Sequence, residues 1–166
     1  MGVSLVAAMS IKPITDTDTL QAFCKRQQGS QYVTVDTEFM REKTYWPILC
    51  LVQIGGPDDA VVVDAMAPNL DLTPLYNLML DQSILKVFHA ARQDLEIFYY
   101  KMGKLPGPIF DTQLAAMVCG FGDQIGYEPL LAKILGVRAN KQSRFSDWYR
   151  RPLTDQQLNY ALGDVT

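Results

Sequence analysis

The chain has 166 residues, of which 48% are hydrophobic and 20% charged, as is typical of one water-soluble globular domain with a continuous core. No apolar stretch approaches the roughly 20 residues of a membrane span, and the start of the chain lacks the features of a secretory signal, so we expect a cytoplasmic protein with no membrane contact. The net charge of −3 argues against a broad basic face for nucleic acid, so any such binding must be local.

The first half of the chain predicts one helix followed by three strands. A helix is expected over residues 16–27, with Thr15 or Asp16 as its cap and Gly29 as its stop. The β-branched and apolar runs at residues 32–35, 48–54 and 60–63 then indicate strands close enough in sequence to be hairpin-like neighbours.

The second half alternates helices and strands, which is typical of crossover units and implies a mixed sheet. Helix 91–102 has the clearest pattern, because its apolar residues recur at helical spacing. The chain stops in mid-pattern, so we expect it to be a fragment of a longer protein. The other elements expected here are a helix over 73–80, strands at 85–89 and 109–110, and helices beginning near 112, 128 and 154.

Asp36 and Glu38 follow directly on the strand expected at residues 32–35. Residues two apart in an extended chain point to the same face, so the two carboxylates are expected to face one spot. Oxygen donors of this kind suit hard cations such as Mg²⁺ or Mn²⁺, which often borrow phosphate oxygens from a substrate. Taken alone, a D-x-E triplet is weak evidence, and an exposed strand end is the plain alternative.

Two further carboxylates are placed where they could converge with this pair. Asp94 lies in the first turn of helix 91–102, after a strand, and such helix starts gather at one edge of an open sheet. Tyr160 and Asp164 are four residues apart and so lie on one face of the last helix. Asp94 could instead serve only the helix dipole, and Asp164 could be a solvated residue beside a half-buried tyrosine.

Other polar residues are given structural roles or left open. Asp111 is expected to cap a helix and Asp64 to be structural. The sole histidine, His89, excludes Ser-His-Asp and multi-histidine zinc sites by count and is either a substrate-side hydrogen-bonding group or a buried structural one. A basic stretch is either a solvated loop or a rim that guides phosphates, and it consists of Arg138, Lys141, Arg144, Arg150 and Arg151. The three cysteines, Cys24, Cys50 and Cys119, are expected in the core.

Three segments together resemble the exonuclease motifs of the DEDD superfamily, ribonuclease D branch: VDTEF at 35–39, FHAARQDL at 88–95 and YALGDV at 160–165. The stretches TYWP at 44–47, DTQ at 111–113 and SDWYRRPLT at 146–154 also resemble ribonuclease D. The resemblance implies a ribonuclease H-like α/β fold, with a five-stranded mixed sheet flanked by helices on both sides. The chain, residues 1–166, would be the exonuclease domain without the helical RNA-binding domains that follow in ribonuclease D.

The resemblance also implies the site. Asp36, Glu38, Asp94 and Asp164 would hold two divalent cations, Mg²⁺ or Mn²⁺, and Tyr160 would orient the attacking water in hydrolysis of the terminal phosphodiester. The tyrosine four residues before the last Asp indicates the tyrosine subtype (DEDDy). The residues that the resemblance implies as substrate contacts are Thr37, Phe39, Arg41, His89 and Lys141.

The expected activity is a 3′-5′ exoribonuclease that releases nucleoside 5′-monophosphates from single-stranded RNA 3′ ends, in tRNA or structured RNA processing, with no protein partner implied. Two alternatives stay open. One is a 3′-5′ exodeoxyribonuclease, because discrimination by a 2′-OH needs only one or two contacts. The other is an inactive ribonuclease H-like nucleic-acid-binding module.

Overall fold

The computed structural model describes residues 11–137 and 146–166, which form five strands and six helices within those ranges. In chain order these are α1 (Thr17–Arg26), β1 (Tyr32–Met40), β2 (Ile48–Gly55), β3 (Ala60–Asp64), α2 (Thr73–Leu80), β4 (Leu85–Phe88), α3 (Arg92–Met102), β5 (Ile109–Asp111), α4 (Thr112–Val118), α5 (Tyr127–Leu135) and α6 (Asp155–Gly163). None of these helices has the length and apolar character to cross a bilayer.

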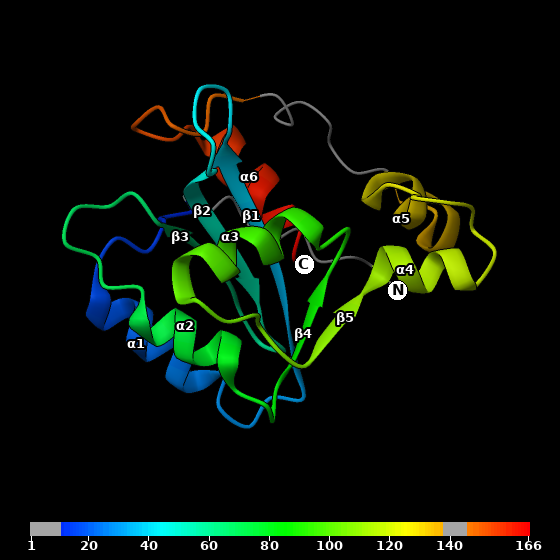
Figure 1. Ribbon diagram of the computed structural model, residues 1–166, viewed down its shortest axis with the longest axis horizontal. Helices are drawn as coiled ribbons and strands as arrows, with labels where there is room; N and C mark the ends of the chain where they lie inside the picture. Colours follow the sequence, from blue (N-terminus) through cyan, green and yellow to red (C-terminus); the bar gives the residue numbers. More distant parts are fainter. Residues whose placement is uncertain (1–10, 138–145) are drawn as a thin grey trace.

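The strands form one five-stranded mixed sheet, as expected, and their order in it is β3-β2-β1-β4-β5. β1 pairs antiparallel with β2, and β2 pairs antiparallel with β3. β1 pairs parallel with β4, and β4 pairs parallel with β5 (Figure 1). The central strand β1 therefore separates a meander from a pair of crossover strands, and its carboxyl end faces the same edge as that of β4.

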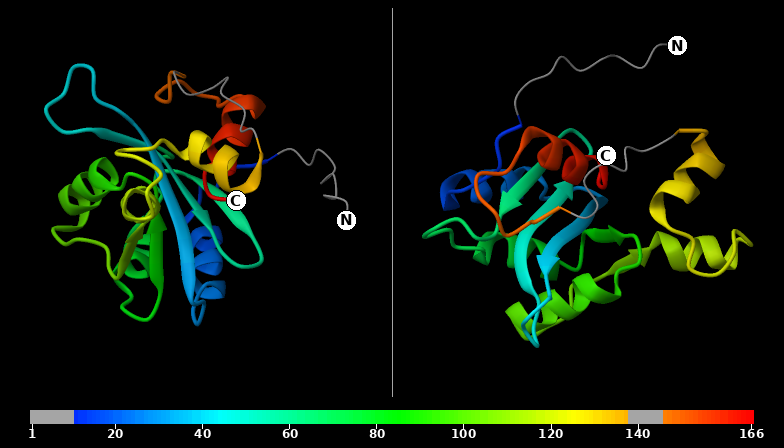
Figure 2. Two further views of the ribbon diagram at one scale, coloured as in Figure 1. Left: turned by 90° about the vertical axis from the view of Figure 1, so that its right-hand side faces the viewer. Right: turned by 90° about the horizontal axis from the view of Figure 1, so that it is seen from above.

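Helices cover both faces of the sheet, which confirms that prediction. One face carries the larger hydrophobic cluster, to which α1, α2 and α3 contribute Leu20, Phe23, Leu75, Met79 and Phe98 among others. The opposite face carries a smaller cluster in which α6 packs on β2 and β3. Seen from above in Figure 2, α3 and α6 lie on opposite sides of the strands.

The ends of the helices follow the sequence. Asp16 caps α1 by accepting a hydrogen bond from the Thr19 amide at 2.8 Å. Thr154 caps α6 in a reciprocal capping box with Gln157, which sets where the last helix begins. Asp111 caps α4, as expected, and its carboxylate also accepts hydrogen bonds from the amides of Ala90 and Ala91 just before α3.

The prediction that all three cysteines are buried is wrong for Cys119. Cys24 and Cys50 are buried, but Cys119 is exposed. It follows α4, which has a single buried residue, Ala116. Helices α4 and α5 extend away from the sheet beyond β5 (Figures 1 and 2), so apolar residues there lack the cover that the two clusters provide.

Candidate metal centre and active site

β1 is longer than the sequence predicted, and this extension carries the first two acidic residues. The expected strand stopped at residue 35, whereas β1 runs to Met40, so Asp36 and Glu38 lie within it. Pairing with β2 sustains the strand there, opposite Gln53 and Leu51, up to an irregularity between Glu38 and Phe39. Pairing with β4 ends at Thr34, so both carboxylates lie past the end of the parallel pair.

Asp94 is brought to the same place by the crossover from β4 to α3. It sits in the first turn of α3 with 6% of its surface exposed. The Thr37 hydroxyl donates a hydrogen bond to its Oδ1. The neighbour of Asp36 in sequence therefore holds Asp94 from β1, and the amino end of the helix favours its negative charge.

The carboxyl end of α6 brings Tyr160 and Asp164 against β1. Asp164 is the residue that ends α6. Immediately after it, the Val165 carbonyl accepts a 2.6 Å hydrogen bond from the Thr34 hydroxyl of β1. This contact joins the end of the chain to the strand that carries Asp36 and Glu38.

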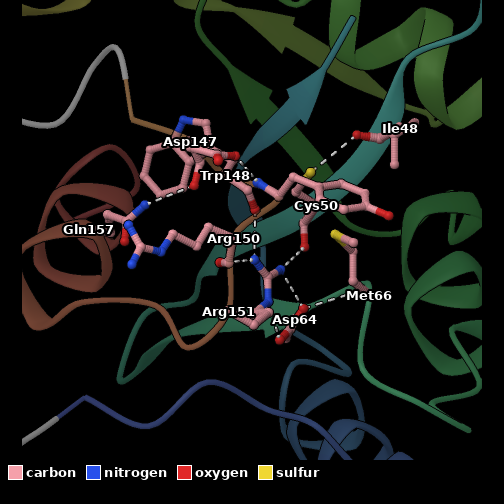
Figure 3. Close-up of polar contacts among 10 residues, drawn as sticks. Ile48, Cys50, Asp64, Met66, Asp147, Trp148, Arg150, Arg151 and Gln157 are labelled. Atoms are coloured by element: carbon pink, nitrogen blue, oxygen red, sulfur yellow. Dashed lines mark hydrogen bonds and ion pairs between the residues drawn. The ribbon is translucent and has the colours of Figure 1, made fainter. Parts of the chain in front are cut away.

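A polar network anchors the segment that leads into α6 (Figure 3). The Arg151 guanidinium donates to both Asp64 carboxylate oxygens, at 2.8 and 2.7 Å, and to the carbonyls of Cys50 and Trp148. Trp148 is buried, and its ring centroid lies 6.1 Å from that of Tyr160. Asp64, expected to be structural, thus ties this segment to the end of β3, while Trp148 supports the Tyr160 ring.

Oxygen atoms of Asp36, Glu38 and Asp164 all lie within 4.8 Å of one another. Burial, reinforced by the charges of Asp94 and Asp164, raises the pKa of Asp36 well above its usual range. Burial, and next the charge of Asp36, raises the pKa of Glu38 to about 9. Burial also raises the pKa values of Asp94 and Asp164 to about 6. Four acidic groups are therefore crowded into one partly enclosed space.

The donor set fits divalent cations. All four groups offer oxygen, the ligand atom that Mg²⁺ and Mn²⁺ prefer. Within residues 11–137 and 146–166, no cationic side chain is among the groups that shift their pKa values. Positive charge from a bound cation would relieve the repulsion among the carboxylates. Without a cation, protonation of the carboxylates relieves it. Asp36, Glu38 and Asp164 would share one cation, with Asp94 beside them.

A cleft of about 550 Å³ opens beside the acidic cluster. Asp36, Tyr160 and Asp164 line one part of it, and His89 and Tyr127 line another. The cleft is large enough for a nucleotide-sized ligand. It runs from the metal-ligand candidates to the start of α5.

The substrate contacts implied by the resemblance mostly have internal partners. The Thr37 hydroxyl is bonded to Asp94, and Arg41 forms a doubly hydrogen-bonded ion pair with Glu96 at 3.0 and 3.1 Å. The His89 ring nitrogens lie 2.9 Å from the Thr112 hydroxyl and 3.0 Å from the Ile125 carbonyl. Phe39 packs against the larger cluster, and Lys141 lies outside the described residues. Contact of these residues with a substrate stays a prediction.

We expect Gly55→Ala to disturb the site by displacing the segment that follows Asp164. A Cβ at this position would lie 2.4 Å from both the Thr34 hydroxyl and the Val165 carbonyl, so the segment next to Asp164 must move, at a cost of about 1 to 3 kcal/mol. Thermal denaturation and steady-state kinetics should show lower stability and lower kcat.

Gly163→Ala is the matched control for Gly55→Ala. A Cβ at Gly163 meets nothing within 4 Å, and alanine favours a helix by up to about 1 kcal/mol over glycine. This variant should keep full activity with equal or higher stability. Equal kcat in the Gly55→Ala variant and the unmodified chain would contradict the inference that packing at Gly55 positions the segment next to Asp164.

Comparison with known proteins decides the family. The model of the family described as "3'-5' exonuclease" matches residues 11–166. The chain belongs to this 3′-5′ exonuclease family. The exonuclease-family resemblance and the ribonuclease H-like fold expected from the sequence are therefore confirmed.

Among curated members of the family, ribonuclease D of Jannaschia sp. is 57% identical over 157 residues, and that of Granulibacter bethesdensis is 54% identical over 153 residues. These matches cover 92% of this chain but 41% and 39% of those proteins, so the chain spans about two fifths of their length. The resemblance to ribonuclease D is thus confirmed for the part of those proteins that the chain matches.

Solved structures of the family agree. Escherichia coli RNase D, described as an exoribonuclease involved in structured RNA processing, superposes with a TM-score of 0.89 at 36% identity, covering 95% of this chain and 42% of that one. Brucella melitensis NrnC with bound Mg²⁺ superposes with a TM-score of 0.73 at 31% identity, covering 84% of this chain and 68% of that one.

Sequence reasoning missed how two residues support the site. Thr37, a predicted substrate contact, also donates its hydroxyl to Asp94. Arg151 was read only as part of a basic stretch, but it binds Asp64 and two carbonyls. The SDWYRRPLT segment carried a signal, because it resembles ribonuclease D outside the three motifs.

Proposed function

We propose that the chain is the catalytic domain of a metal-dependent 3′-5′ exoribonuclease. The observation that carries the proposal is the group of Asp36, Glu38 and Asp164 oxygens within 4.8 Å of one another, with Asp94 buried beside them and with Asp36 and Asp164 lining the cleft. The match to the exonuclease family and the similarity to ribonuclease D support it. The substrate would be the 3′ end of single-stranded RNA, including tRNA or structured RNA precursors, and the products nucleoside 5′-monophosphates.

Two divalent cations, Mg²⁺ or Mn²⁺, would supply the charge that stabilises the entering and leaving oxygens at the terminal phosphodiester. Asp36 would contact both ions, Glu38 and Asp164 one of them, and Asp94 the other. The Mg²⁺ in the structure of Brucella NrnC supports this choice of metal. The role of the chain's own carboxylates would be to hold the cations in a site from which bulk water is partly excluded.

Tyr160 would position the attacking water. Burial, and next the charge of Asp164, raises the pKa of its phenol above the usual value, so the hydroxyl stays protonated at neutral pH. A protonated phenol donates a hydrogen bond but is a poor proton acceptor. We therefore assign Tyr160 an orienting role, as expected for the tyrosine subtype.

Tyr160→Phe should lower kcat by about 10- to 100-fold with a much smaller change in the cation concentration that gives half-maximal rate. The ring and its contact with Trp148 are kept, so only the hydroxyl is lost. Steady-state rates over a Mn²⁺ titration measure both quantities. Tyr76→Phe, a half-buried tyrosine of α2, is the control and should leave both unchanged. A loss of cation affinity in Tyr160→Phe as large as the loss of kcat would contradict the orienting role.

Labelled oligonucleotides test the proposed function directly. RNA and DNA of one sequence, labelled at the 5′ end, are incubated with Mg²⁺, Mn²⁺ or chelator, and the products are separated by length. We expect stepwise shortening of RNA from the 3′ end only with a divalent cation. Faster shortening of DNA would favour the exodeoxyribonuclease alternative, and cleavage that persists in chelator would overturn the metal-dependent proposal.

A further inference from the structure

Gln53 is a fully buried amide without a hydrogen-bond partner. It lies within the apolar strand β2 with 0% of its surface exposed. Neither its Oε1 nor its Nε2 has a partner among the described residues. Burying an amide in this way costs free energy, and native proteins keep few such groups without a reason. Packing alone would be served as well by an apolar side chain of the same length.

The register of the sheet places Gln53 next to Asp36. The two residues are directly opposed in the antiparallel pairing of β1 and β2. Opposed side chains lie on the same face, with Cβ atoms about 4.5 to 5.5 Å apart. On its other side Gln53 is opposed by Val62 of β3, which has no polar side-chain atoms. Asp36 is thus the polar side chain that the strand pairing sets beside this amide.

The other buried acids of the site show what this amide can do. Asp94 accepts a hydrogen bond from the neutral Thr37 hydroxyl. Asp164 accepts one from the neutral Tyr160 hydroxyl, which partly offsets the rise in its pKa. Among residues 11–137 and 146–166 no such side-chain donor to Asp36 is found, although Asp36 is central to the cluster. Ligand carboxylates are usually held by hydrogen bonds from surrounding groups, which fix their orientation.

We propose that Gln53 is the positioning residue for Asp36: its side-chain amide donates a hydrogen bond to the Asp36 carboxylate when the site holds its cations. This inference rests on the proposed function and deepens it. Gln53 cannot touch a polynucleotide, because it is enclosed by the sheet and by the cluster that α6 forms over β2 and β3. Its effect must therefore pass through Asp36 and appear in cation affinity and kcat, with the KM for RNA unchanged.

The test replaces the amide with an apolar side chain of similar length, Gln53→Met, with Gln53→Leu as a second variant. Removing an unpaired buried amide should leave the Tm of the cation-free protein unchanged or raise it by about 2 to 4 °C. Mn²⁺ binding measured by calorimetry should weaken by about 10-fold or more, and kcat should fall by about 10- to 100-fold. Stability and function would then change in opposite directions.

Gln27→Met is the matched control. Gln27 is also buried, but its Nε2 donates to Asp59 at 2.8 Å, at the end of α1. This variant should have a lower Tm, because it loses that bond, with Mn²⁺ binding and kcat unchanged.

Unchanged Mn²⁺ affinity and kcat in both Gln53 variants of an active enzyme would overturn the inference and leave the proposed function in place. Weakened Mn²⁺ binding in those variants, in a chain that degrades neither RNA nor DNA, would support the role of Gln53 and contradict the proposed function instead.

Discussion

Asp36→Asn should lower the rate of RNA degradation by about 1000-fold or more, which corresponds to about 4 kcal/mol of lost transition-state stabilisation. The negative charge of Asp36 acts directly on its neighbours in the cluster, since it is among the groups that raise the pKa of Glu38. Its replacement keeps the shape of the side chain and removes the charge on which cation binding depends. Single-turnover rates with Mg²⁺ and with Mn²⁺ measure the loss.

The same variant should be at least as stable as the unmodified chain at pH 8 without cations. Burial and two neighbouring carboxylates disfavour the charged form of Asp36, so a neutral amide relieves that cost. Urea denaturation measures this difference. Asp71→Asn, at an exposed carboxylate beside the start of α2, is the control and should keep full activity. An Asp36→Asn protein that retains activity within a factor of about two would contradict the metal-site assignment.

The cation-free chain should lose stability as the pH rises from 6.5 to 7.5. The pKa of Glu38 is raised to about 9 and that of Asp36 lies well above its usual range, so the folded state keeps protons that the unfolded state has already released. Stability falls with pH wherever the folded state binds more protons, by about 1 kcal/mol per pH unit for each such proton. Urea denaturation at several pH values measures the slope.

Two other titrating groups oppose this trend without cancelling it. Burial lowers the pKa of His89 from its ordinary value of 6.5, so near pH 6.5 the unfolded state holds part of a proton that the folded state lacks, and this contribution fades toward pH 7.5. The pKa of Lys86 is lowered to about 8, so its opposing contribution begins near the top of the window and is largest above it. A Glu38→Gln variant should have a smaller slope. Stability of the unmodified chain that rises between pH 6.5 and 7.5 would show that these carboxyls are not crowded.

Saturating Mg²⁺ or Mn²⁺ should reverse the trend. Cations bind the ionised carboxylates, so binding releases protons and becomes more favourable as the pH rises. The gain in Tm on adding cation should therefore be larger at pH 7.5 than at pH 6.5. A gain that is independent of pH would indicate that the cation binds elsewhere.

Much of the fold could be predicted because it depends on interactions between residues that are near one another in the sequence. The caps at Asp16, Asp111 and Thr154 depend on side chains that bond to nearby amides, so they can be read from neighbouring residues. The alternation of apolar runs and turn residues indicated five strands and their order along the chain. The end of β1 could not be predicted, because residues 36–40 stay extended through pairing with a strand that follows later.

The motif residues could be identified from sequence through their resemblance to the ribonuclease D branch, and their roles as metal ligands stay a proposal. Their support could not be, because it comes from residues far apart in the chain. The Thr34 bond to Val165 and the Arg151 bonds to Asp64 join positions 131 and 87 residues apart. Gln53 shows the same limit: in sequence it is one polar residue in an apolar run, and only the register of β1 on β2 sets its buried amide beside Asp36. Local sequence determines which side chains can carry the chemistry, whereas hydrogen bonds and burial between distant segments decide what holds them in place.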